Sequence, residues 1–390
     1  MSLCSVPSQN FSPSQHEKKV AIVHDWLVTF GGAERVVQQL LSMYPQADIF
    51  TLVYDERKMG AYFPPEKVHT SYIQKFPFAT KLYTKLLKYM PGAFERFNLT
   101  DYDLVIASSS SCAKGVITSP GTPFIAYIHT PMRYAWDMYF EYQSHANFLT
   151  RHFMNKWMPA IRQWDYISSQ RIDTLVANSS YIAQRIHKFW NRDATVVYPP
   201  VDTERLAPNE KPAEDFYVVF SRFVSYKRID LAISACGKMK RRLVVIGSGP
   251  EEKNLKAVAE QFKCFGNLFT FTGRISDEEV HDYLARCRAL IFCAEEDFGI
   301  IPVEAQACGR PVIAYGKGGA LETVIDSKTG VFFSEQTESS LCDAMTRFEA
   351  LEKKNVFEPK KIAKHAAAFS NERFRKQMSK AISETEERLS

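Results

Sequence analysis

Segment 286–323 constrains the fold more than any other part of the chain. An apolar run over 289–293 is typical of a buried parallel strand, and it ends in an acidic turn at 295–297 before a helix expected to start at Gly299. In open α/β sheets, ligands lie at the carboxyl ends of strands, where the N–H groups of a helix start can bind an anion. This order of elements therefore predicts an α/β fold with a ligand site at the turn.

Two carboxylates of this segment have a spacing that suits a sugar nucleotide. Glu296 precedes the expected helix and Glu304 lies inside it, so the E-x7-E pattern presents both to one crevice. Gly299 lets the backbone approach an anion closely, and Phe298 and Ile300 beside it are further candidates for donor contact. A phosphate-binding helix start beside two hydroxyl-binding carboxylates suggests a nucleotide joined to a sugar. The alternative is a solvated acidic turn followed by an ordinary helix-face glutamate.

The turns that follow complete a known pattern. Gly309 suits the position just after a helix end, Pro311 starts the next buried strand, and 316–319 forms another close-approach loop. With these residues, the run from Glu296 to Glu322 resembles the E-x7-E signature and glycine loop of the retaining GT-B glycosyltransferases of family 4. The resemblance covers nearly the whole chain. It implies two doubly wound, Rossmann-like parallel-sheet domains that face each other across a cleft.

The length and the prolines near the middle indicate two domains. A chain of 390 residues exceeds one ordinary core, and two prolines within 196–202 favour a stiff crossing. We place residues 1–205 in an N-terminal domain, 206–370 in a C-terminal domain, and 371–390 in a helix that returns to the first. In the family, the first domain binds the acceptor and the second binds the nucleotide-sugar.

Composition predicts a cytoplasmic protein. Apolar residues make up 45% and charged residues 24%, no apolar run could span a bilayer, and the start of the chain is polar rather than a signal peptide. The cysteines form no C-x-x-C pair, which favours free thiols over disulfides or zinc. They stand at positions 4, 112, 236, 264, 287, 293, 308 and 342.

The net charge of +5 comes from the first half, where residues 1–200 carry 20 Lys and Arg against 15 Asp and Glu. Within it, 75–89 interleaves lysines with aromatics at near-helical spacing. This pattern predicts a helix lying on an anionic membrane surface or a solvated helix with one buried stripe. A second such stretch, 148–164, is expected beside the acceptor entrance. Nucleic acid is disfavoured, because the charge is modest and no recognition motif occurs.

The first domain offers two candidate site segments. A strand at 20–24 leads to Gly31 and Gly32 before a helix, a geometry that brings N–H groups to a phosphate, although a tight turn is the alternative. No G-x-G-x-x-G follows a predicted strand, which disfavours an NAD enzyme. The strand at 124–128 delivers His129 and Arg133 at its carboxyl end. Their H-T-P-x-R-x-x-W run is similar to bacterial GDP-mannose-dependent mannosyltransferases of polysaccharide assembly, and implies a catalytic His129 and a substrate-binding Arg133.

Two further patterns concern metals and phosphates. Asp101 and Asp103 form a D-x-D pair, but it precedes its strand and so lies at the wrong edge of the sheet for a ligand. Arg222 and Lys227 flank a strand-to-helix loop, can converge on one diphosphate, and match the family's R-x4-K pair. In the family, the loop after the strand at 268–272 meets the base, which gives the candidates Gly273, Arg274, Ile275 and Asp277.

The resemblance implies transfer of a hexose, mannose from GDP-mannose, to a glycan or lipid-linked acceptor with retained configuration. Arg222 and Lys227 would stabilise the diphosphate, so no metal or other cofactor is expected. Glu304 would bind the ribose, and Glu296 with His129 would hold the sugar. The departing phosphate is implied to deprotonate the acceptor, so no protein base is assigned. The alternatives are a UDP-sugar donor and a non-catalytic glycan-assembly subunit.

Overall fold

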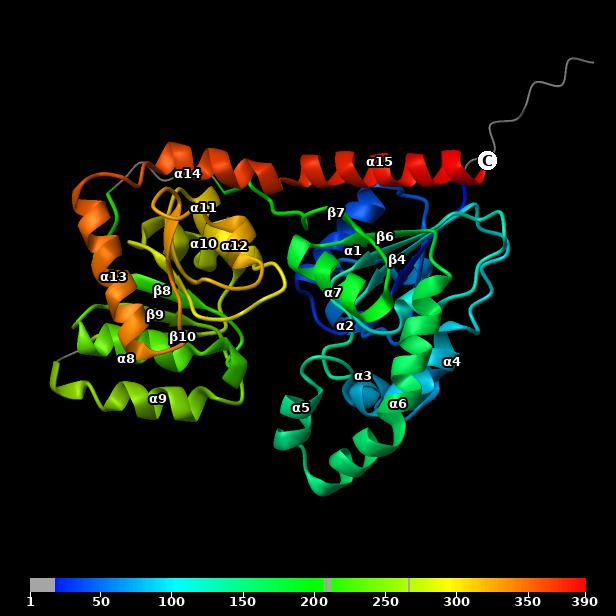
Figure 1. The fold of residues 1–390 in the computed structure, drawn as a ribbon, viewed down its shortest axis with the longest axis horizontal. Helices are drawn as coiled ribbons and strands as arrows, with labels where there is room; N and C mark the ends of the chain where they lie inside the picture. Colours follow the sequence, from blue (N-terminus) through cyan, green and yellow to red (C-terminus); the bar gives the residue numbers. More distant parts are fainter. Residues whose placement is uncertain (1–17, 207, 209–211, 266) are drawn as a thin grey trace, which may run out of the picture.

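The structure, a computed structural model, describes residues 18–206, 208, 212–265 and 267–390. Within these ranges, two all-parallel sheets lie side by side, each surrounded by helices (Figure 1). The strand order is β3-β2-β1-β4-β5-β6-β7 in the first sheet and β10-β9-β8-β11-β12-β13 in the second. Two doubly wound, Rossmann-like domains confirm the GT-B architecture expected from the sequence.

The first sheet contains β1 (Val20–His24), β2 (Asp48–Thr51), β3 (Val68–Thr70), β4 (Leu104–Ser109), β5 (Phe124–Ile128), β6 (Thr174–Ala177) and β7 (Thr195–Val196). Its helices are α1 (Gly32–Met43), α2 (Glu56–Met59), α3 (Ala79–Leu82), α4 (Met90–Phe94), α5 (Tyr139–His145), α6 (Phe148–Gln170) and α7 (Ser180–Trp190).

The second sheet contains β8 (Tyr217–Phe220), β9 (Leu243–Ile246), β10 (Phe269–Gly273), β11 (Leu290–Phe292), β12 (Val312–Tyr315) and β13 (Gly330–Phe333). Its helices are α8 (Ile229–Lys238), α9 (Glu252–Glu260), α10 (Asp277–Arg286), α11 (Ile300–Ala307), α12 (Ala320–Thr323), α13 (Glu338–Lys353) and α14 (Pro359–Ala366), followed by α15 (Asn371–Leu389).

The strands are apolar on both faces because helices cover both. In the second sheet, Val245 and Ile291 belong to the core shared with α8 and α13. Val244 and Leu290, one residue away along the same strands, belong to the core shared with α10 and α11. Successive side chains of a strand point to opposite faces, so a sheet buried on both faces needs continuous apolar runs.

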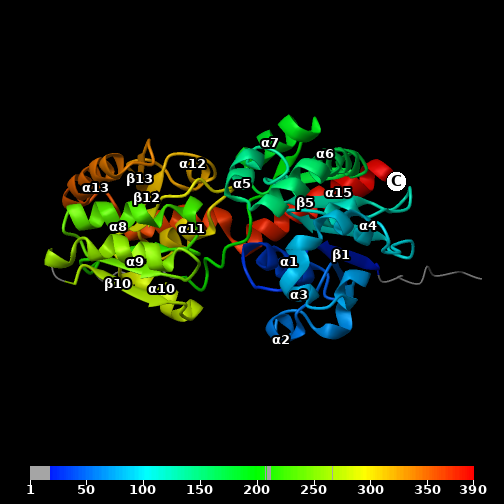
Figure 2. The same ribbon diagram turned by 90° about the horizontal axis from the view of Figure 1, so that it is seen from below.

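Helix α15 leaves the second domain and packs on the first (Figure 2). Its buried Phe374, Met378 and Ile382 share a core with β1, β4 and β5 of the first sheet. Ser370 caps the helix by accepting a hydrogen bond from the N–H of Arg373. The expected return of the last segment to the first domain agrees with this packing, while the division at residue 205, which falls between β7 and β8, stays a prediction.

The expected helix over 75–89 is wrong. The segment breaks into a 3₁₀ turn, the short α3, and a 3₁₀ segment at Tyr83–Tyr89, because Phe78 takes a left-handed φ of 57° and Leu86 departs from helical geometry. Helix α6 does begin at Phe148, as the second stretch predicts. Among the described residues, no helix is long and apolar enough to cross a membrane.

The structure also bears on the cysteines and on the D-x-D pair. The seven described cysteines are free thiols, while Cys4 and the polar start of the chain lie outside the described residues. Asp103 accepts a hydrogen bond from the backbone N–H of Lys19 at 2.8 Å, beside the amino ends of β1 and β4. The D-x-D pair therefore lies at the sheet edge away from the carboxyl ends of the strands.

Candidate active site

The carboxyl ends of both sheets border one cleft of about 670 Å³ between the domains. Each sheet reverses its strand order there, at β1/β4 and at β8/β11, and such switch points are where open α/β sheets bind ligands. Most of the predicted site residues line this cleft: Gly31, Gly32, His129, Arg133, Lys227, Arg274, Ile275, Asp277, Glu296, Phe298, Gly299, Ile300 and Glu304. Arg222 and Gly273 are the two candidates that do not.

Glu304 is held by a residue that sequence reasoning did not assign. The glutamate is only 2% exposed, and Arg35 on α1 donates a 2.7 Å hydrogen bond to it from the other domain. Arg35 also lies 3.6 Å from Asp277. Burial raises the pKa of Glu304, and the charge of Arg35 opposes that rise. Arg35 lies near the start of α1, where a positive charge opposes the helix dipole and is stabilised by a carboxylate partner. Its position in the sequence could therefore have indicated that it pairs with an acidic residue.

The glycine turn before α1 touches the start of α11. A Cβ added to Gly32 would lie 2.6 Å from Cδ1 of Ile300, so a larger residue there would have to displace the end of the Ile300 side chain. Gly299 takes a φ of 86°, in the left-handed region that glycine adopts without strain. Because both glycines line the cleft, the starts of α1 and α11 face the same space.

Lys227 and Glu296 both line the cleft and form an ion pair with each other. The ammonium of Lys227 donates to a carboxylate oxygen of Glu296, and both side chains are largely buried. The sequence placed Lys227 on a diphosphate and Glu296 on a sugar. In the structure each neutralises the other instead, so an anion that binds there would compete with Glu296 for the lysine.

Arg222 lies apart from this pair. It is exposed and forms no ion pair with a described residue. It does face the first domain: burial raises the pKa of Tyr83, and the positive charge of Arg222 opposes that rise. The neighbouring Phe223 is buried in the second core, so the loop backbone is fixed and the guanidinium points outward.

Asp297 joins the two domains through two arginines. Its carboxylate accepts hydrogen bonds from Arg133 and from Arg185, the latter at 3.2 Å, and its carbonyl accepts one from Ser179 at 2.6 Å. Burial raises the pKa of Asp297, and the charges of Arg133 and Arg185 oppose the rise. Arg133, expected on the substrate, is therefore already engaged by the second domain. Sequence reasoning missed the pair of Asp297 and Arg185, because the two residues are 112 positions apart in the chain.

A second interdomain contact is made at the start of α7. The carboxylate of Glu322 accepts hydrogen bonds from the backbone N–H groups of Ser180 at 2.8 Å and Tyr181 at 3.0 Å. The phenol of Tyr181 donates to Glu295 at 3.0 Å. A carboxylate at a helix N-terminus satisfies free donors and complements the dipole. The second domain thus caps a helix of the first.

His129 lines the cleft and begins a chain of polar contacts with the buried Ser108 and His24. Its Nε2 lies 2.8 Å from the hydroxyl of Ser108, which in turn lies 3.2 Å from Nδ1 of His24. His24 contacts Glu34 at 3.4 Å. Burial and the nearby His24 lower the pKa of His129 to about 3. For His24, burial lowers the pKa but Glu34 outweighs it, so the net direction is upward. His129 is thus a neutral hydrogen-bonding group at neutral pH.

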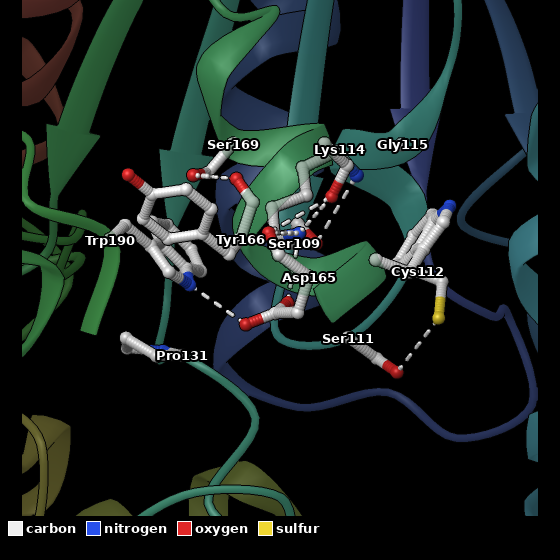
Figure 3. Close-up of polar contacts among 12 residues, drawn as sticks. Ser109, Ser111, Cys112, Lys114, Gly115, Pro131, Asp165, Tyr166, Ser169 and Trp190 are labelled. Atoms are coloured by element: carbon white, nitrogen blue, oxygen red, sulfur yellow. Dashed lines mark hydrogen bonds and ion pairs between the residues drawn. The ribbon is translucent and has the colours of Figure 1, made fainter. Parts of the chain in front are cut away.

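The loop that carries His129 is anchored by a buried ion pair (Figure 3). Asp165 on α6 accepts hydrogen bonds from the indole N–H groups of Trp136 at 2.8 Å and Trp190 at 2.7 Å. Lys114 lies 2.9 Å from the same carboxylate, and both charged side chains are buried. Trp136 is the last residue of the H-T-P-x-R-x-x-W run, so this pair fixes the loop from behind.

The cleft therefore combines two kinds of binding group. Lys227, Arg35 and the start of α11 favour an anion, whereas Glu296 and Glu304 can accept hydrogen bonds from hydroxyl groups. Among the described residues, no three His, Cys, Asp or Glu side chains are grouped so that they could hold a metal ion.

Comparison with known proteins identifies relatives of both halves. The family described as Glycosyl transferases group 1 matches residues 201–368, and Glycosyltransferase Family 4 matches residues 30–205. A GDP-mannose-dependent alpha-(1-6)-phosphatidylinositol monomannoside mannosyltransferase of Mycobacterium tuberculosis is 31% identical over 202 residues, which is 44% of this chain and 51% of that protein. A D-inositol 3-phosphate glycosyltransferase of Mycolicibacterium smegmatis is 26% identical over 217 residues, 51% of this chain and 50% of that one. The chain spans about half the length of the curated relatives it matches.

Solved structures share the whole fold. Anabaena HepE in complex with UDP has a TM-score of 0.69 at 17% identity, covering 94% of this chain and 100% of that one. Sucrose-phosphate synthase from Thermosynechococcus elongatus has a TM-score of 0.69 at 18% identity, covering 93% and 98%. At this identity the likeness shows the fold alone. With the two family matches and the cleft between the sheets, the chain belongs to glycosyltransferase family 4, with a glycosyl transferases group 1 domain as its second half.

Proposed function

We propose that the chain is a glycosyltransferase that moves a hexose, mannose from GDP-mannose, onto a polysaccharide or lipid-linked acceptor with retention of configuration. The observation that carries the proposal is the cleft itself, where cations of both domains and carboxylates of the second domain meet at the carboxyl ends of the two sheets. A nucleotide-sugar needs both: cations for its diphosphate, and carboxylates for its hydroxyl groups.

The chemistry follows from the charges that develop. Breaking the anomeric C–O bond leaves positive charge on the sugar and negative charge on the diphosphate. When a diphosphate enters, Lys227 exchanges Glu296 for phosphate oxygens, which frees Glu296 for the sugar hydroxyls. Lys227 and the N–H groups at the start of α11 then stabilise the leaving group. Glu304, oriented by Arg35, accepts from the ribose hydroxyls.

Neutral His129 lies within the same cleft and offers a hydrogen bond to the sugar rather than a proton to the leaving group. The departing phosphate takes the acceptor proton on the same face of the sugar, and this route needs no protein base. Arg222 is exposed and does not line the cleft, so it reaches the diphosphate only if its side chain turns toward the cleft.

The donor preference rests on the mannosyltransferase relative and on the H-T-P-x-R run. Asp277 at the start of α10 borders the cleft, and its carboxylate can accept the N1–H and N2–H₂ donors of guanine. A UDP-sugar donor is the second candidate, since HepE is a structural neighbour solved with UDP. A cytoplasmic location, with the acceptor held at an anionic membrane, completes the proposal.

A nucleotide screen tests the proposal. GDP should raise the melting temperature more than UDP does, because a ligand that binds only the folded state stabilises it by mass action. A shift with UDP and none with GDP overturns the donor assignment, and no shift with either overturns the function. Lys227→Ala should lower GDP-mannose hydrolysis by roughly two to three decades. Lys328→Ala, an exposed lysine of the same domain, is the matched control and should leave hydrolysis unchanged.

A further inference from the structure

An apolar cavity of about 550 Å³ lies in the first domain beside the cleft. Its walls come from the 3₁₀ segment Tyr83–Tyr89, α5, α6 and the loop that follows β5. Buried Leu87, Met90, Met154 and Met158 form its interior. In Figure 1, α3, α5 and the first turns of α6 project together below the first sheet. Cavities of this size hold small molecules or chains of similar volume.

The mouth of the cavity exposes large apolar side chains. Leu149 lines it and is 77% exposed, and Phe148 before it is 81% exposed. Clustered exposed apolar residues next to an apolar cavity mark a binding site for an apolar partner rather than ordinary surface. Met154 and Met158 add flexible, polarizable walls that adapt to the shape of a chain.

The charge of the lining is positive. Lys85 lines the cavity, and among its described lining residues there is no carboxylate. Lys88, on the same 3₁₀ segment, lies 5.3 Å from the ring of Trp157 on α6 and so joins two walls. An occupant with an apolar body and an anionic head fits this arrangement better than a neutral lipid or a peptide.

The inner end of the cavity reaches the cleft. Tyr142 lines both spaces, while the neighbours Ser110 and Ser111 line the cleft and the cavity respectively. The hydroxyl groups of Ser111 and Tyr134 lie 2.8 Å apart there, so the apolar interior gives way to polar groups. A molecule that fills the cavity therefore has one end next to the cleft residues.

We propose that this cavity holds the hydrocarbon chain of a lipid-linked acceptor, with the acceptor's phosphate beside Lys85 and its sugar end reaching the cleft past Tyr142. The assignment rests on the proposed function, because it supplies the acceptor for that transfer. Each methylene of the chain that is buried in the cavity raises the affinity by about fourfold, so four buried methylenes raise it by roughly 250-fold.

The test uses dodecyl phosphate, below its micelle concentration, and ethyl phosphate as probes for the whole protein. Binding is followed by calorimetry and by intrinsic tryptophan fluorescence, to which Trp26 in the cavity wall contributes. The wild type should bind dodecyl phosphate at least a hundredfold more tightly than ethyl phosphate. Dodecyltrimethylammonium, with the opposite head charge, should bind at least tenfold more weakly than dodecyl phosphate. Equal binding of the two phosphates, or preference for the cation, overturns the proposal.

Two variants at exposed lining positions leave the core untouched. Thr150→Trp fills the cavity and Leu149→Asp places a carboxylate at its mouth, so both should weaken dodecyl phosphate by at least tenfold. Ile117→Asp, which alters an exposed apolar residue elsewhere in the domain, is the matched control and should bind like the wild type. All three should keep the wild-type thermal shift with GDP.

Other occupants give distinct results. Phosphatidylglycerol vesicles could bind the wild type and Thr150→Trp equally but fail to bind Leu149→Asp. In that case the mouth of the cavity contacts a bilayer, and the cavity assignment is wrong. A dimer that dissociates in Leu149→Asp, with unchanged dodecyl phosphate affinity, assigns the patch to a second copy instead. If dodecyl phosphate binds but neither GDP nor UDP changes the melting temperature, the proposed function is refuted and the apolar site remains. If a nucleotide binds but dodecyl phosphate does not, only this inference is refuted.

Discussion

Lys114→Met is expected to destabilise the first domain strongly. The ammonium of Lys114 is buried, donates to the hydroxyl of Ser168 at 2.6 Å, and lies 4.9 Å from the ring centroids of both Trp164 and Trp190. Asp165 beside it is buried as well. Methionine has a similar length and preserves packing against the two rings, so the substitution removes mainly the positive charge (Figure 3).

The expected magnitude follows from the burial of both charges. Removing one partner of a buried ion pair costs about 3–5 kcal/mol, because the remaining charge loses its counter-ion in a medium of low polarity. For a domain of this size, each kcal/mol lowers the melting temperature by about 2–4 °C. Lys114→Met should therefore melt roughly 6–20 °C below the wild type. The two indole donors keep Asp165 hydrogen-bonded, which favours the lower part of that range.

The double variant Lys114→Met/Asp165→Asn separates charge from packing. In the double variant, the asparagine oxygen can still accept hydrogen bonds from both indoles, and neither position 114 nor position 165 carries a charge. The double variant should therefore have a higher melting temperature than Lys114→Met. Calorimetric melting with and without GDP measures both effects. If Lys114→Met melts within 2 °C of the wild type, or if the double variant is no more stable than the single one, the ion pair does not have the stabilising role assigned to it.

Three further predictions concern the cleft. Because the pKa of His129 is lowered to about 3 in the folded protein, its neutral form contributes stability above about pH 6.5 that is lost as pH falls from there toward 3. His129→Gln should therefore lose less melting temperature than the wild type between about pH 7 and pH 4. Glu296→Gln should bind GDP as tightly as the wild type or more so, since it frees Lys227, whereas Glu304→Gln should bind it more weakly. Calorimetry that finds both glutamate variants equally weakened contradicts this division of roles. Glu322→Ala removes the cap that the second domain places on α7, so small-angle scattering should show a larger radius of gyration without nucleotide, and an unchanged radius would argue against that cap as a domain contact.

The sequence by itself determined the local order of elements and the edge of each sheet where ligands bind. Apolar runs followed by glycine-containing turns placed strands before helices, and the strands at 20–24 and 124–128 match β1 and β5. His129 comes directly after β5 and Glu296 four residues after β11, so their place at the cleft followed from the predicted strand ends. Ser276 and Glu279 form a capping box at the start of α10, a contact between residues only three apart.

Tertiary structure alone decided which side chains meet. Arg35 and Glu304 are 269 residues apart, and only the approach of the two domains brings them to 2.7 Å. Packing within the second domain pairs Lys227 with Glu296, which are 69 residues apart, while Arg222 stays exposed. The basic segment 75–89 breaks into short turns. Local sequence fixes backbone geometry within a few residues, whereas a charge buried between domains takes whichever counter-charge the packing of two separate sheets brings within reach.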